Sequence, residues 1–131
     1  MPAVMVEVRR QYTREQEATL MEAIHSALVQ AFKIPDHDRT ARLVVHEPHR
    51  LVCAPGLTTP EFFTLVTIDA FAGRSLDAKR ALYRAIVTNL ESLGIPKDHV
   101  TIVLNELPKE NWGIRGGQAG SDVAMGFKIE V

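Results

Sequence analysis

Two kinds of hydrophobic spacing alternate along this chain. Residues 2–8 are rich in valine and mix apolar runs with alternation, and residues 41–46 are similar, so both segments are predicted strands. Between them, apolar residues recur at intervals of three and four, which predicts one buried face of a helix. These positions are Leu20, Ala23, Ile24, Ala27, Leu28, Ala31 and Phe32. Residues 2–46 therefore predict a β-α-β unit.

Local signals set the ends of this helix. Thr13, followed three residues later by Gln16, predicts a capping box in which each side chain bonds the other residue's backbone N–H. Ile34-Pro35 ends the helix, because proline biases the preceding residue away from the helical backbone.

The same pattern starts again after a loop. Residues 64–70 predict a strand, Ser75 predicts a helix N-cap, and residues 100–104 predict a fourth strand. A shift of 62 positions overlays the second half on the first. We therefore predict one α+β domain over residues 1–131, a duplicated β-α-β fold with a four-stranded core sheet and two helices on one face. The expected parts are repeat units at about 2–46 and 64–104, a linker at 47–63 and a tail at 105–131.

Composition excludes several classes of protein. The chain has 131 residues, 46% of them hydrophobic and 24% charged, which is typical of a globular domain. A net charge of −1 gives no electrostatic reason to expect nucleic acid or an anionic membrane as partner. No apolar run is long enough to span a membrane, and the amino terminus does not resemble a signal peptide. Cys53 is the only cysteine, which fits the reducing cytoplasm.

The amino terminus is the first candidate for chemistry. Proline in second place favours removal of Met1, which leaves a secondary amine on Pro2. An α-amino group titrates near pH ~8, and an apolar environment with a nearby cation disfavours its charged form. A neutral amine at this position is fit to act as a general base or a nucleophile.

Topology predicts which residues lie near Pro2. Strands of a β-α-β unit run parallel, so Pro2 and Asp38, which precedes the second strand, share one edge of the sheet. If the two units pack about a two-fold axis, the strand at 64–70 ends at that edge, where Gly73 and Arg74 follow it. Arg74 offers a planar fork for a carboxylate, beside a helix N-terminus that itself favours anions. We therefore expect Pro2, Asp38 and Arg74 to converge.

These features resemble the tautomerase superfamily, and most of all its malonate semialdehyde decarboxylase-like branch. Residues 31–39 are similar to that branch's Ala-Phe-Gly-Val-Pro…Asp-Arg segment, which places Asp38 on its catalytic aspartate. Arg74-Ser75 matches an Arg-Ser pair that opens the second helix. Residues 111–114, Asn-Trp-Gly-Ile, fall where the branch has a tryptophan and an aromatic residue lining its pocket. The resemblance implies Trp112 and Ile114 as substrate-binding residues.

The resemblance also carries expectations about assembly and chemistry. It implies a tautomerase/MIF-like fold and a homotrimer in which three sheets form the interior and the tail bridges neighbouring chains.

One position departs from the pattern: the decarboxylase has two arginines spaced Arg-x-Arg, and Ala72 stands here in place of the first. This departure favours enol–keto interconversion, which needs a base, a carboxylate anchor and a dry pocket.

We therefore expect a tautomerase, an isomerase acting on enol and keto forms of small 2-oxo acids. Pro2 removes and returns the proton, Arg74 binds the substrate carboxylate and stabilises the oxyanion, and Asp38 orients a water or the substrate hydroxyl. Phe71 as a pocket wall and Arg115 as a contact to the anionic substrate are further candidates. Two alternatives stay open: a decarboxylase or hydratase of the malonate semialdehyde type, with Pro2 protonated, and a non-catalytic binding module.

Neither a metal nor a bound cofactor is expected. The five histidines, His25, His37, His46, His49 and His99, have no spacing that would place a metal-binding pair on one helix face. The glycine-rich segment at 113–120 lacks both common phosphate-loop patterns, so a flexible or interface-forming tail is the expectation there.

Overall fold

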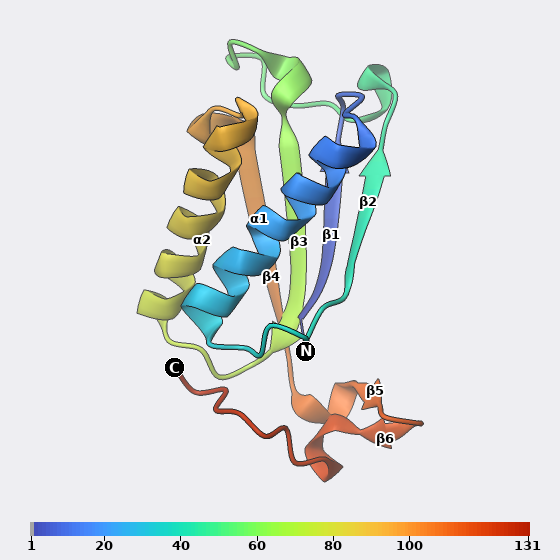
Figure 1. Ribbon diagram of the computed structural model, residues 1–131, viewed down its shortest axis with the longest axis vertical. Coiled ribbons are helices and arrows are strands. Elements are labelled where there is room, and N and C mark those ends of the chain that lie inside the picture. Colours follow the sequence, from blue (N-terminus) through green and yellow to red (C-terminus); the bar gives the residue numbers. More distant parts are fainter. Residues whose placement is uncertain (1) are drawn as a thin grey trace.

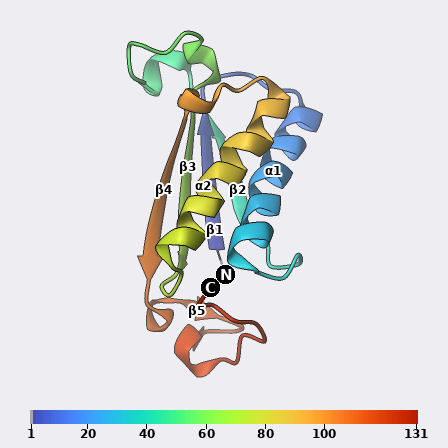
Figure 2. The same ribbon diagram turned by 90° about the vertical axis from the view of Figure 1, so that its left-hand side faces the viewer.

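The computed structural model describes residues 2–131; Met1, whose removal the sequence predicts, lies outside the described residues. The first unit comprises β1 (Pro2–Val8), α1 (Arg14–Phe32) and β2 (Ala41–Val45). The second comprises β3 (Thr64–Phe71), α2 (Leu76–Leu90) and β4 (Val100–Leu107). Figure 1 and Figure 2 show both helices packed on the same face of one four-stranded sheet. The predicted duplicated β-α-β architecture is confirmed.

The sheet has the order β2-β1-β3-β4. Strands within each unit are parallel, and the two units meet through antiparallel pairing of β1 with β3. In that pairing Pro2 lies opposite Ala70, and Val8 lies opposite Thr64. The amino end of β1 and the carboxyl end of β3 therefore lie at the same edge of the sheet, as the sequence predicts.

Buried and half-buried residues alternate along β1, and the buried ones form the surface on which the helices pack. Val4, Val6 and Val8 are buried on the helical face, whereas the residues between them face the opposite side and are only half-buried. Most of the largest fully buried side chains of the core come from both helices and β3; they include Phe32, Leu20, Ile24, Leu28, Ile68, Leu82, Ile86 and Leu90. The face of the sheet away from the helices has no covering layer within the described chain (Figure 2).

The helix ends follow the predicted signals. Thr13 caps α1 in a reciprocal capping box with Gln16, with bonds of 2.9 and 3.1 Å. The helix ends at Lys33, which takes the left-handed conformation with φ of 57°, just before Ile34-Pro35. Ser75 caps α2 by accepting from the Ala78 N–H at 3.1 Å.

Two segments differ from expectation. β4 continues to Leu107 instead of ending at residue 104, because Asn105, Glu106 and Leu107 go on pairing with the end of β3. The tail forms a two-stranded sheet of β5 (Gly113–Ile114) and β6 (Gln118–Ala119) and then returns to α2. There the backbone oxygen of Val131 accepts from the Ser75 N–H at 3.0 Å. Among the described residues, neither helix is both long and apolar enough to cross a membrane.

Candidate active site

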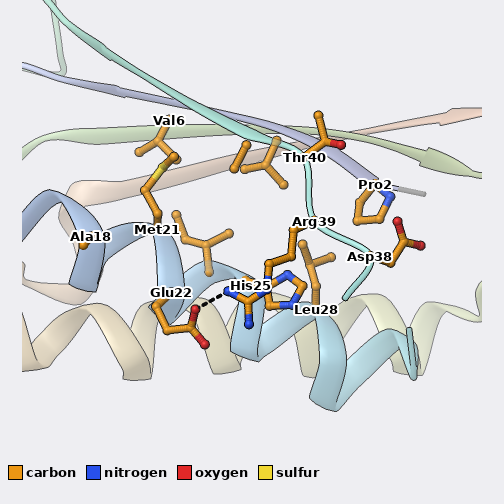
Figure 3. Close-up of a pocket in the computed structure, with 13 residues that line it drawn as sticks. Pro2, Val6, Ala18, Met21, Glu22, His25, Leu28, Asp38, Arg39 and Thr40 are labelled. Carbon is orange, nitrogen blue, oxygen red and sulfur yellow. Dashed lines mark hydrogen bonds and ion pairs between the residues drawn. The ribbon is translucent and has the colours of Figure 1, made fainter. Parts of the chain in front are cut away.

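A cavity of about 470 Å³ lies between α1 and the sheet edge formed by β1 and β2 (Figure 3). Its walls are mainly apolar, with polar groups gathered from the loop before β2 and from one face of α1. The lining residues are Pro2, Val4, Val6, Ala18, Met21, Glu22, Ile24, His25, Leu28, Asp38, Arg39, Thr40 and Ala41. An apolar cavity with a few convergent polar groups is the ordinary form of a small-molecule site.

Pro2 and Asp38 stand at the same end of this cavity. Figure 3 shows the Asp38 side chain beside Pro2, where β1 begins and the loop approaches β2. Backbone hydrogen bonds fix this loop: the Asp38 N–H donates to Pro35 O at 3.0 Å, and the Val4 N–H donates to Thr40 O at 2.9 Å. The second bond ties the loop directly to β1, so the two candidate residues are held by one small rigid unit.

Arg39 crosses the cavity from the loop to α1. Its guanidinium binds the Glu22 carboxylate, and it also donates to the Asp36 carboxylate and to the Asp36 backbone oxygen, both at 3.0 Å. The hydrogen bond to Glu22, followed by the one to Asp36, raises the pKa of Arg39 above its usual value. The cation therefore stays charged, and its two carboxylate partners neutralise it.

His25 is the buried polar group of the α1 face and is 8% exposed. Its Nε2 lies 2.8 Å from the backbone oxygen of Asp36. Because a carbonyl oxygen only accepts, Nε2 carries the proton in this contact. His25 thus fastens the start of the Asp36–Thr40 loop to the helix and borders the cavity at the same time.

Arg74 lies near Asp38 but is not among the residues that line the Pro2 cavity. It is 6% exposed, its guanidinium stacks over the Phe32 ring at 4.7 Å, and one N–H group donates to Phe71 O at 3.0 Å. Burial lowers the pKa of Arg74, and attraction to Glu106, Asp38 and Glu130 partly offsets this shift. Its Nε is buried with no hydrogen-bond partner, so this N–H group is an unused donor of the guanidinium.

The remaining candidates gather around the tail, outside the Pro2 cavity. Trp112 packs edge-on against Phe71, with ring centroids 5.2 Å apart, and its Nε1 is buried without a partner. Ile114 pairs with Gln118 in the small hairpin. Arg115, in the left-handed conformation with φ of 48°, donates to Ala124 O at 3.1 Å.

Arg115 nevertheless reaches the Asp38 loop from its other side. A second cavity, of about 280 Å³, is lined by Arg115, Met125 and Phe127 of the tail and by residues 35 and 37–40 of the loop. Asp38, Arg39 and Thr40 border both cavities. Within a single chain, therefore, the structure unites Pro2 with Asp38 and leaves Trp112, Phe71, Ile114 and Arg115 on the tail side.

Sequence reasoning missed the contribution of α1 to this cavity. His25 follows Met21 by four residues and Glu22 by three, so its side chain lies on the same side of α1 as theirs. His25 is also a histidine within the apolar repeat of this helix. A histidine in an apolar helix face and an arginine next to Asp38 are the sequence features that would have indicated that α1 forms the second wall of the cavity.

The chain resembles known proteins along most of its length. A family model described as a tautomerase enzyme matches residues 38–115, more than half of the chain. The chain belongs to the tautomerase family. Two curated relatives agree. A probable tautomerase of Ralstonia nicotianae is 30% identical over 53 residues, which cover 40% of this chain and 76% of the relative. A 2-hydroxymuconate tautomerase of Comamonas testosteroni is 40% identical over 48 residues, covering 36% and 76%.

Solved structures of this tautomerase's relatives match nearly the whole chain. A malonate semialdehyde decarboxylase, studied for its decarboxylase and hydratase activities, has a TM-score of 0.83 at 26% identity and covers 93% of this chain and 99% of its own. A second malonate semialdehyde decarboxylase has a TM-score of 0.74 at 28% identity, covering 89% and 92%. A fused 4-OT symmetric trimer has a TM-score of 0.80 at 26% identity, covering 91% and 96%. The chain is thus an enzyme of the tautomerase family, and these matches confirm its resemblance to the malonate semialdehyde decarboxylase-like branch.

Proposed function

We propose that this tautomerase interconverts enol and keto forms of small 2-oxo acids, with the secondary amine of Pro2 as general base. The observation that carries the proposal is the shared cavity of Pro2 and Asp38, whose walls are mainly apolar. Such walls disfavour the charged form of an amine, which keeps it available to accept a proton. The proposal requires that Met1 is removed, so that Pro2 carries a free amine.

The reaction moves one proton between two atoms of the substrate. The Pro2 nitrogen accepts the enol hydroxyl proton, which leaves an enolate. The carbonyl double bond then forms as the electrons of the carbon–carbon double bond take a proton from the Pro2 ammonium at carbon 3. No atom is gained or lost. Asp38 orients the substrate hydroxyl or a water beside Pro2, and the apolar walls limit competing access by solvent.

Arg74 supplies the positive charge in this proposal. Its attraction to Asp38 supports a place near the reacting end, and its unpartnered Nε is a donor suited to a carboxylate or a developing oxyanion. In this proposal Arg74 binds the substrate carboxylate, which therefore lies on the side of Asp38 that is nearer to Arg74. Trp112, Phe71, Ile114 and Arg115 are proposed to contribute to substrate binding from the tail.

The active assembly is proposed to be a homotrimer. The sheet face away from the helices has no layer over it within the described chain and carries Val103, which is 43% exposed. A fused 4-OT relative of this fold is a symmetric trimer. Packing three such faces together would bury them and bring the tail of one chain to its neighbour, which is the arrangement that the family resemblance implies.

A decarboxylase of malonate semialdehyde type is the second candidate, favoured by the match to two malonate semialdehyde decarboxylases. It needs Pro2 in the protonated form, whereas tautomerisation by a general base needs the neutral amine.

The test is turnover of the enol of phenylpyruvate by the mature protein and by Pro2→Ala. The proposal expects the variant to lose at least about a hundredfold in kcat/KM, the usual size of a general-base contribution. Equal rates in the two proteins would leave only a non-catalytic role for the amine.

A further inference from the structure

The cavity that holds Pro2 extends well beyond the space that a small 2-oxo acid fills. It runs along β1 from Pro2 past Val4 to Val6, a distance of roughly 13 Å at the usual rise of a strand. On the opposite wall it follows α1 from Leu28 to Ala18, roughly 15 Å at the rise of a helix. Its volume of about 470 Å³ is within the range of pockets that enclose drug-sized ligands.

Polar and apolar residues occupy different ends of this cavity. Asp38 and Thr40 stand at the Pro2 end, whereas Val6, Met21 and Ala18 surround the far end (Figure 3). Glu22 and Arg39 lie between α1 and the loop, and each is engaged by the other, with Arg39 also held by Asp36. The far end therefore offers an apolar surface and no unengaged charged group of its own.

Met21 suits the far end to flexible ligands. Methionine is unbranched and polarisable, so it adapts to apolar groups of irregular shape. It is half-buried on α1, and Ala18, one turn earlier, is exposed and leaves room beside it. The far end is thus open enough to admit a chain and apolar enough to retain it.

We infer that this tautomerase prefers 2-oxo acids with an apolar tail of about six carbons, held between β1 and α1 with the enol at Pro2 and Asp38. The inference rests on the proposed function, because it takes Pro2 as the reacting end. Met21 and Ala18 then determine specificity, and they take no part in proton transfer.

The expected preference for the longer substrate can be estimated from the apolar surface that its tail buries. Burial of one methylene contributes about 0.8 kcal/mol, which is roughly a fourfold gain in kcat/KM. Four additional methylenes then favour 2-oxooctanoate over 2-oxobutanoate on the order of a hundredfold. The assay is loss of the proton signal at carbon 3 in deuterated water, followed by NMR, since enolisation exchanges that hydrogen for deuterium from the solvent.

Two variants test where the tail lies. Met21→Trp fills the far end, and Ala18→Leu narrows it with a smaller change. Both should lower the ratio of kcat/KM for 2-oxooctanoate to kcat/KM for 2-oxobutanoate at least tenfold. Ser26→Leu is the matched control, because Ser26 is also an exposed small residue of α1 but does not line the cavity; it should change neither rate. Thermal unfolding of each variant confirms that the fold is intact.

A binding measurement separates this inference from the proposed function. Octanoate and propanoate, which do not enolise under these conditions, are titrated by calorimetry into the wild-type protein, Pro2→Ala and Met21→Trp. Tighter binding of octanoate that survives Pro2→Ala and is lost in Met21→Trp supports the apolar-tail site even if Pro2 proves not to be the base. Equal affinity for both acids, or a preference that neither Met21→Trp nor Ala18→Leu changes, would overturn the inference.

Discussion

Pro2 lies directly opposite Ala70 in the antiparallel pairing of β1 with β3. Because of this pairing, the first residue of one β-α-β unit meets the last part of the other unit's first strand. Phe71 and Arg74 follow Ala70 closely, and Asp38 approaches the same edge through the loop before β2. Duplication followed by antiparallel joining is thus the physical reason that three segments distant in sequence meet at one end of the sheet.

The first prediction concerns the charge of Arg74. Arg74→Met keeps an apolar stem against Phe32 and removes the guanidinium, so kcat/KM should fall on the order of 10² to 10³, as expected when an electrostatic stabiliser is lost. Steady-state kinetics on an enol substrate measures the effect. The lost hydrogen bond to Phe71 O should also lower the free energy of unfolding by about 1–3 kcal/mol.

Arg80→Met is the control for this change. Arg80 lies on α2, which begins just after Arg74, is exposed and pairs only with the exposed Asp77 among the contacts described, so its loss should leave kcat/KM within about twofold. If Arg74→Met behaves like Arg80→Met in activity, the guanidinium has a structural role alone.

Asp38→Asn tests the second member of the site. The change keeps the size of the side chain and removes its charge beside Pro2, so kcat should fall about tenfold to a thousandfold if Asp38 orients the reacting group. Asp77→Asn, at an exposed carboxylate remote from the cavity, provides the comparison. Full activity of Asp38→Asn would remove Asp38 from the mechanism.

Tyr12 gives a prediction for stability and its pH dependence. Its hydroxyl is buried with no hydrogen-bond partner, so Tyr12→Phe should raise the free energy of unfolding by about 1 kcal/mol at pH 7. Burial raises the pKa of Tyr12, and the nearby Arg10 lowers it by a smaller amount. Above about pH 10 the unfolded chain loses this proton before the folded chain does, so the wild type should lose stability as pH rises.

Urea unfolding at pH 7 and near pH 10.5 checks both parts of the Tyr12 prediction. The advantage of Tyr12→Phe over wild type should widen with pH. Tyr83→Phe, at the other tyrosine, should show no comparable gain. A Tyr12→Phe protein that is less stable than wild type would indicate a hydroxyl partner in solution.

The proposed trimer predicts a response to charge on the uncovered sheet face. Val103→Lys places a cation on that face, on the edge strand β4, so sedimentation should shift from the mass of three chains toward the mass of one. Val52→Lys is the matched control, since Val52 is 84% exposed in the linker. A wild-type protein that sediments as a single chain would contradict the trimer.

The sequence predicts the fold well because its signals are local and repeated. The alternation in β1, the capping box of Thr13 and Gln16, and the N-cap at Ser75 each occur where the pattern indicates. The end of β4 is one exception: Asn105 and Glu106 are polar and do not suggest a strand, but backbone pairing with Asp69 and Ala70 extends it to Leu107.

The site is less completely predictable from sequence. The common edge of Pro2 and Asp38 follows from parallel strands and a right-handed crossover, which are general rules. The role of Arg39 and His25 depends instead on how α1 sits over the loop, and tertiary packing decides that. The same holds for Arg74: its position after β3 is predictable, but its stacking on Phe32 and its distance from the cavity wall are not.

The central claim is that Pro2 is a neutral amine in a mostly apolar cavity. Asp38 favours the charged form, but Asp38 is also attracted to Arg74, and the apolar walls oppose the charge. Intact-mass analysis first confirms the loss of Met1, and nitrogen NMR of labelled protein then follows the Pro2 amine through a pH titration. The account predicts that the pKa of this nitrogen lies below about 8, the ordinary value of an α-amino group, so that the amine is neutral at pH 8. A Pro2 nitrogen that stays protonated well above pH 8 would contradict the general-base mechanism and favour the decarboxylase.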